Sequence, residues 1–109
     1  MRNKIKVYIS GPIAGIPDYL DRFANAEEEL TEAGFVVMNP AKIQYEMPSD
    51  TTQTEYMSIS MRLLEMCDAI FMLSGWEYSR GAMAEYHYAH SIGLDLFETD
   101  GDKFYKGVF

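Results

Sequence analysis

The chain has 109 residues, a hydrophobic fraction of 48%, and 9 Lys and Arg against 17 Asp and Glu, which gives a formal net charge of −8. This length fits one domain, and the apolar fraction excludes a disordered chain. The acidic balance argues against a polynucleotide partner, because proteins that grip nucleic-acid backbones carry a basic face. The single cysteine, Cys67, excludes an intramolecular disulfide framework and a cysteine-based zinc site.

No run of about 18 apolar residues is present, so we expect no membrane-spanning segment and no membrane partner. The chain enters a strand-like segment at Lys4 without the features of a signal peptide. We therefore expect a cytoplasmic protein.

The first half of the chain predicts a strand, a helix and a second strand. Lys4–Ser10 alternates and then becomes apolar, as a strand does. A loop with Gly and Pro follows, and then a helix for which Asp18 is the expected N-cap and Gly34 the expected C-terminal glycine. Phe35–Met38 is predicted as a second short strand, and residues 39–51 are expected to be irregular.

The second half repeats this alternation. Thr52 and Glu55 have the spacing of a capping box and predict the start of a helix. Ala69–Leu73 is a continuous apolar run, which is typical of a parallel strand buried on both faces. A helix over about Ser79–Ile92 and a weak strand at Leu94–Thr99 are predicted next.

This order predicts an α/β protein with a three-layer Rossmann-like or flavodoxin-like fold, in which a parallel sheet of about four strands carries helices on both faces. Residues 1–99 are assigned to the domain, and 100–109 to a C-terminal tail that packs on the domain or on a partner subunit. Ligands of such sheets bind at the carboxyl ends of the strands. We therefore expect the site between the loops Ser10–Asp18 and Ser74–Arg80.

The loop segment Ser10–Gly15 follows the first predicted strand. A glycine-containing turn before a helix exposes backbone N–H groups that suit a phosphate or a carboxylate. Its spacing matches neither the dinucleotide-binding fingerprint nor the P-loop. A tight strand-to-helix turn, in which Ser10 is an ordinary turn serine, explains the spacing equally well.

Glu85 is the carboxylate that stands out in the last predicted helix. In a helix over Ser79–Ile92, it shares one face with the small residues Ala82 and Ala89. Burying an unpaired carboxylate costs several kcal/mol, so this placement indicates an active-site nucleophile or general base. The alternative is a Glu85 that faces solvent because the helix is rotated.

Several other residues have two interpretations. Trp76 can stack on a planar ligand or pack the loop, and Asp68 can act in the site or satisfy a helix–strand junction. Ser79 can donate to an anion or cap the helix. His87 and His90 have metal-ligand spacing without an obvious third ligand, so we expect no metal and no other cofactor.

Four segments together resemble a known superfamily. They are Val7-Tyr8-Ile9-Ser10-Gly11-Pro12-Ile13, Asn39-Pro40, Cys67-Asp68-Ala69-Ile70 and Gly75-Trp76-Glu77-x-Ser79-x-Gly81-Ala82-x-x-Glu85. Over about residues 5–98 the chain resembles the nucleoside 2-deoxyribosyltransferase-like superfamily, and most closely a small uncharacterised branch from phages and bacteria. The superfamily also includes 2′-deoxynucleoside 5′-monophosphate N-glycosidases.

The resemblance implies chemistry at the N-glycosidic bond of nucleosides or nucleotides. Glu85 matches the glutamate that attacks the anomeric carbon, and Tyr8 matches the tyrosine that orients it. Ser79 matches the residue that contacts the 5′-phosphate in relatives acting on monophosphates, so a nucleoside 5′-monophosphate is favoured over a free nucleoside. The expected substrate-binding residues are Ser10, Gly11, Pro12, Ile13, Gly15, Asp68, Gly75, Trp76, Ser79 and Gly81.

One departure from the superfamily leaves the activity open. Relatives carry an acidic residue where Ser60 stands, and a serine does not act unaided as a general acid near neutral pH. The expected function is a hydrolase or transferase acting on a nucleotide or nucleoside. The alternatives are a nucleotide-binding module without turnover and a structural or interaction protein. The resemblance also implies a homo-oligomer.

Overall fold

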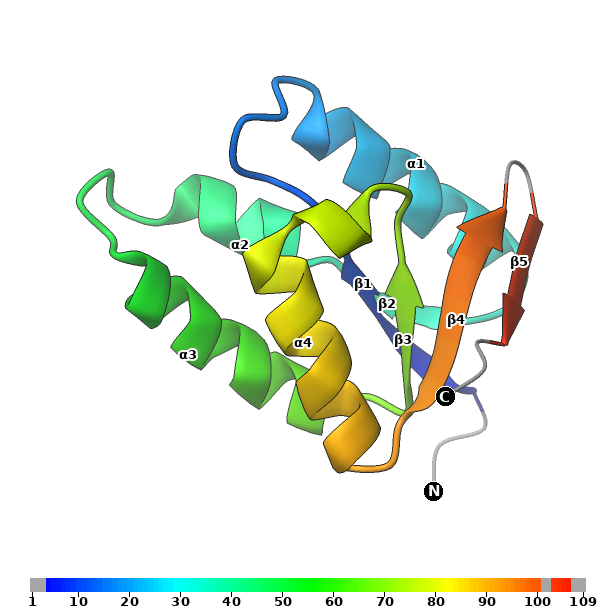
Figure 1. Ribbon diagram of the computed structural model, residues 1–109. Coiled ribbons are helices and arrows are strands. Elements are labelled where there is room, and N and C mark those ends of the chain that lie inside the picture. The colour runs from blue at the N-terminus through cyan, green and yellow to red at the C-terminus, as the bar shows by residue number, and fades with distance from the viewer. Residues whose placement is uncertain (1–3, 101–102, 107–109) are drawn as a thin grey trace.

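The computed structural model describes residues 4–100 and 103–106, and within them one sheet has the strand order β2-β1-β3-β4-β5 (Figure 1). The first four strands are parallel, and β5 is antiparallel to β4. The strands are β1 (Lys6–Ser10), β2 (Val36–Met38), β3 (Ala69–Met72), β4 (Asp95–Asp100) and β5 (Lys103–Lys106). The predicted α/β fold with a parallel sheet of four strands is confirmed.

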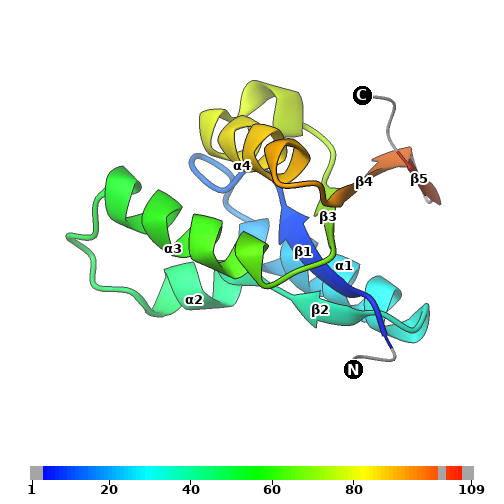
Figure 2. The ribbon, with the colours of Figure 1, turned by 90° about the horizontal axis from the view of Figure 1, so that it is seen from below.

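Four α-helices and a short 3-10 helix, η1, connect these strands. They are α1 (Tyr19–Glu32), α2 (Pro40–Glu46), α3 (Gln53–Glu65), η1 (Trp76–Tyr78) and α4 (Arg80–Ser91). Figure 2 places α1 and α4 on opposite sides of β1 and β3. No helix within the described residues is long and apolar enough to cross a membrane.

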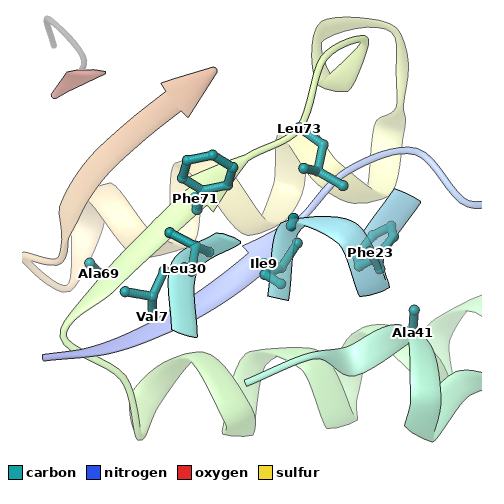
Figure 3. Close-up of a cluster of buried hydrophobic side chains, with 9 residues drawn as sticks. Val7, Ile9, Phe23, Leu30, Ala41, Ala69, Phe71 and Leu73 are labelled. Carbon is teal, nitrogen blue, oxygen red and sulfur yellow. The ribbon is translucent and has the colours of Figure 1, made fainter. Parts of the chain in front are cut away.

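The strand β1 separates two hydrophobic clusters because its side chains alternate between the faces of the sheet. Val7 and Ile9 pack with Phe23 and Leu30 of α1 in the first cluster, which Figure 3 shows. Tyr8 belongs to the second cluster, which α3 and α4 cover. Helices therefore lie on both faces of the sheet, as predicted.

Helix ends follow the sequence signals in most places. The Thr52 hydroxyl accepts a hydrogen bond from the Glu55 backbone, and the Glu55 carboxylate accepts one from the Thr52 backbone, which confirms the capping box. Gly34, with φ of 100°, follows the C-cap of α1. Asp18 is the N-cap residue of α1, but its side chain makes no capping hydrogen bond.

Two elements differ from the prediction. Residues 39–51 are not entirely irregular, because Pro40–Glu46 forms α2, in which the Asn39 side chain caps the Ala41 backbone and Pro40 occupies the first turn. The strand β5 (Lys103–Lys106) was not predicted and pairs with β4. It falls in the segment that the sequence assigns to the tail.

Strand order locates the topological switch point. β2 and β3 flank β1 on opposite sides, so the chain leaves β1 in one direction and returns on the other. The carboxyl ends of β1 and β3 lie side by side, with Ser10 paired to Met72. Parallel sheets bind ligands at such a crevice.

Candidate active site

Glu85 lies on the face of α4 that packs against the sheet, and its side chain is only 8% exposed. Ala82 and Ala89 flank it along the same face and are both buried. Their small side chains let the helix approach β1 closely. The predicted helix face, with a carboxylate between two alanines, is confirmed, and the solvent-facing alternative is wrong.

Two hydroxyl groups from β1 hold both oxygens of this carboxylate. Tyr8 Oη donates to Glu85 Oε2 at 2.5 Å, and Ser10 Oγ donates to Glu85 Oε1 at 2.5 Å. The two donors are themselves 0% and 1% exposed. Because alternate residues of a strand share a face, one strand supplies both donors. The carboxylate is thus fixed in one orientation without a neighbouring cation among the hydrogen-bond partners described.

Burial and hydrogen bonding act on the acidity of Glu85 in opposite directions. Burial raises the pKa of the Glu85 carboxyl, and hydrogen bonds from Ser10, Tyr8 and Ser60 oppose this rise by favouring the carboxylate. Burial, followed by the neighbouring Glu85 charge, raises the pKa of the Tyr8 phenol well above its ordinary value. Tyr8 therefore remains a neutral hydrogen-bond donor near neutral pH.

A cavity of about 890 Å³ opens above Glu85. It is bounded by the loop after β1, the loop after β3, the first turns of α4, and residues of α1, α2 and α3. The volume falls within the range of small-molecule sites. The two loops expected to border the site therefore meet at one cavity, at the switch point of the sheet.

Seven of the sequence-predicted site residues line this cavity, namely Gly11, Pro12, Ile13, Gly75, Ser79, Gly81 and Glu85. Tyr8 and Ser10 lie beneath them and contact Glu85 instead of the open space. Gly15 does not line the cavity, although its neighbours Ala14 and Ile16 do.

Two predicted residues lie elsewhere. Asp68 is at the opposite end of β3, where its carboxylate accepts a hydrogen bond from the Lys6 backbone at 2.9 Å. Trp76 stacks on Tyr86 with ring centroids 4.5 Å apart, and its indole N–H donates to Glu98 at 3.3 Å. The placement of Asp68 and Trp76 favours the structural interpretation of each residue.

The comparison with known proteins concerns most of the chain. A family model described as a domain of unknown function, DUF4406, matches residues 5–98. The chain belongs to the DUF4406 family. A search of the curated proteins finds no match. The family description names no activity, so the function rests on the chemistry of the site.

In this DUF4406 domain, sequence reasoning named only Ser60 from one wall of the cavity, as the position where relatives carry an acidic residue. Four residues of α3 with helical spacing form this wall, namely Gln53, Tyr56, Met57 and Ser60. The spacing of i, i+3, i+4 and i+7 marks one helix face, but only Tyr56 and Met57 of the four are hydrophobic, so the pattern does not suggest a buried face. The Ser60 hydroxyl also lies near Tyr8 and Glu85 and opposes the rise in the pKa of each.

Two arginines of the cavity were also missed. Arg80 lies at the first turn of α4, and Arg22 reaches from α1 to donate to the Ser74 backbone carbonyl at 2.7 Å. Arg80 ends the loop that the sequence predicts to border the site, but it was not singled out as a site residue. Arg22 carries no local sequence signal, because its contact spans 52 residues. The cavity thus combines a carboxylate at its floor with two guanidinium groups on its walls.

The histidines take no part in this arrangement. His87 and His90 are both exposed on α4. Within the part of the chain that the structure describes, no three His, Cys, Asp or Glu side chains gather as a metal site would require. The chemistry available at this site is therefore that of the Glu85 carboxylate, the hydroxyls around it and the two arginines.

Proposed function

We propose that this chain cleaves or transfers the N-glycosidic bond of a nucleoside 5′-monophosphate or nucleoside, with Glu85 as the nucleophile. The observation that carries the proposal is the Glu85 carboxylate at the cavity floor, held by Tyr8 and Ser10 at 2.5 Å each. Buried carboxylates without a structural partner of opposite charge are concentrated at active sites. The resemblance to nucleoside 2-deoxyribosyltransferase-like proteins supports the same assignment.

The reaction follows from this arrangement. Glu85 attacks the anomeric carbon of the sugar, forming a glycosyl ester as the bond to the base breaks. Water or a second base then displaces the carboxylate. Tyr8 and Ser10 keep the carboxylate in place, so that little reorganisation is needed at the transition state.

The proposed preference for a 5′-monophosphate depends on hydrogen-bond donors in the cavity wall. Ser79 caps α4 by accepting from the Ala82 backbone at 3.2 Å, and Arg22 and Arg80 line the same cavity. Hydroxyl and guanidinium groups donate well to a phosphate dianion. We therefore favour a 5′-monophosphate over a free nucleoside.

The test is base release from a panel of nucleosides and 5′-monophosphates, followed by chromatography. Glu85→Gln should lower the rate by at least about 1,000-fold, because it removes the nucleophile but keeps the shape. Glu77→Gln is a matched control, since Glu77 is an exposed carboxylate on η1. Release that survives Glu85→Gln unchanged would exclude this mechanism.

A second candidate is a nucleotide-binding module without turnover. The observation that favours it is the α3 wall, in which Ser60 and its neighbours offer no acid for the leaving base. Calorimetric binding of a nucleotide without any base release over long incubation would support this second function and contradict the first.

A homo-oligomer remains part of the proposal. Tyr78 lines the cavity yet is 93% exposed, so a neighbouring copy that covers it would also narrow the cavity mouth. Light scattering at micromolar concentration tests this, and a monomer would count against it.

A further inference from the structure

The α3 wall lies close to the part of α4 that presents Glu85. A side-chain carbon added at Gly81 would lie 3.3 Å from Gln53 Nε2 and 3.6 Å from Met57 Sδ, so these two side chains reach across to α4. Gly81 precedes Glu85 by about one helical turn. A sugar whose anomeric carbon meets Glu85 therefore places its base within reach of the α3 wall.

The chemical character of that wall is neutral. Among the described residues that line the cavity, the charged side chains are Glu85, Arg22 and Arg80, and none of them is on α3. The wall offers an amide, a phenol, a thioether and an alcohol. None of these groups is a strong enough acid near neutral pH to protonate a departing ring nitrogen, and guanidinium groups do not give up a proton.

We propose that this site acts on nucleotides whose base already carries a positive charge on a quaternised ring nitrogen, such as a pyridinium or an N7-alkylated purine. The inference rests on the proposed function. Such a base needs no proton to leave. The bond between the anomeric carbon and the base nitrogen breaks, its electron pair neutralises the base, and the Glu85 carboxylate forms the glycosyl ester. Water then takes the place of Glu85 at the anomeric carbon and releases one proton to solvent.

The wall also suits such a base as a ligand. Tyr56 brings an aromatic ring, which attracts a flat cation through its π face, and Met57 brings a polarizable sulfur atom. Gln53 can both donate to and accept from polar groups at the edge of the base. Arg22 and Arg80 line the same cavity and complement a 5′-phosphate. A nucleotide with a positive base and a negative phosphate thus matches the charge pattern of the cavity.

The experiment compares base release from N7-methyl-GMP with release from GMP, and adds nicotinamide mononucleotide as a pyridinium substrate. Rates without protein are subtracted, because quaternised bases leave more readily by themselves. We expect both cationic substrates to exceed GMP by at least about 100-fold in kcat/KM, the lower range of what general acid catalysis contributes. Rates within about tenfold of one another would overturn the proposal.

A gain-of-function variant tests whether the preference arises because the α3 wall has no acid to protonate the leaving base. Ser60→Asp places a carboxyl beside Glu85, and the like charge would keep it protonated and able to act as an acid. It should raise release from GMP and narrow the preference for N7-methyl-GMP by at least about tenfold. Ser60→Asn, which has the same shape but no acid, should leave the preference wide. An equal preference in the Asp and Asn variants would contradict this explanation.

The outcomes separate this proposal from the proposed function. Release from GMP as fast as from the cationic substrates refutes the preference and leaves the glycosidase function standing. Release from none of these nucleotides and from no member of the wider panel refutes both. If Ser60→Asp fails to fold, the ratio measured with the unmodified protein decides.

Discussion

The two faces of β1 are formed by alternate residues of one short strand, and they differ in polarity. Val7 and Ile9 pack on α1 in a cluster of buried hydrophobic side chains. One residue along, Tyr8 and Ser10 point toward α4 and hold the Glu85 carboxylate. A strand of five residues thus contributes to a hydrophobic core on one face of the sheet and to a polar site on the other.

The residues of the α1 face stabilise the domain, and those of the α4 face form the candidate site. The α1 face gains mainly from apolar burial, whereas the α4 face carries a buried carboxylate whose desolvation opposes folding. Among the described residues, no buried side-chain nitrogen or oxygen lacks a hydrogen-bond partner. The polar face is therefore fully satisfied, and its carboxylate is retained at a thermodynamic disadvantage, as functional groups often are.

Among substitutions on the α1 face of the sheet, Phe23→Ala should cause the largest loss of stability. Phe23 is fully buried against β1 and β3, so we expect a loss of about 3–5 kcal/mol in the free energy of unfolding. Urea denaturation measures it. Tyr78→Ala removes an aromatic ring that is 93% exposed and should change the stability by no more than about 0.5 kcal/mol. Similar losses in the two variants would show that the α1 face is not the main core.

Gly11→Ala tests the point where the two faces meet. Gly11 lines the cavity, and a Cβ there would lie 2.8 Å from Cβ of Leu73, which belongs to the hydrophobic cluster on the α1 face. We expect a loss of about 1–3 kcal/mol from overpacking. Gly81→Ala is the matched control, because its Cβ meets only the side-chain atoms Gln53 Nε2 and Met57 Sδ, at 3.3 and 3.6 Å, and the substitution gains helix propensity. An equal loss at both glycines in thermal denaturation would argue against a specific clash with Leu73.

Ser79→Ala separates a structural from a binding role on the polar face. Ser79 caps α4 and Thr52 caps α3, so alanine at either position should cost about 1 kcal/mol of stability. Only Ser79 lines the cavity. We therefore expect Ser79→Ala, and not Thr52→Ala, to raise the KM for a 5′-monophosphate relative to the nucleoside. If the two variants share one KM ratio, Ser79 is a cap and nothing more.

The last prediction concerns the direction in which stability changes with pH, which depends on the buried Glu85 charge. Burial raises the pKa of Glu85 above the ordinary value of 4.5, so the folded protein binds this proton more tightly than the unfolded chain does. The stability that Glu85 contributes is complete below about pH 4.5 and is lost as the pH rises through the raised pKa. Glu85→Gln mimics the protonated form at every pH.

The stability of Glu85→Gln relative to the unmodified protein should therefore increase as the pH rises from 4 to 8. Chemical denaturation across that range measures the difference. Glu27, Glu55 and Glu65, whose pKa values are lowered by hydrogen bonds, are present in both proteins and cancel. A difference that stays flat or falls with pH would mean that the carboxylate is not destabilised in the fold.

Periodicity explains why so much of this arrangement could be predicted from the sequence. The alternation in β1, the apolar run of β3 and the placement of Glu85 between two alanines each depend on neighbours within one element. The capping box at Thr52 is equally local. These signals are sufficient to place a carboxylate on the sheet side of α4.

The features that escaped prediction depend on contacts distant in sequence or on short elements. The helix α2 has seven residues, too few for a helical period to emerge. Arg22 enters the cavity through a contact with Ser74, and β5 is held by pairing with β4. Trp76 could stack on a planar ligand or pack the loop, and tertiary packing against Tyr86 decides its position.

The hydrogen bonds around Glu85 have a consequence for how the protein is made. Tyr8 and Glu85 are 77 positions apart, and Ser10 and Glu85 are 75 apart. During synthesis β1 emerges before α4, so the Tyr8 and Ser10 hydroxyls are without the Glu85 carboxylate until more than 70 further residues have been added. A chain that lacks α4 therefore cannot form this hydrogen-bonded carboxylate centre.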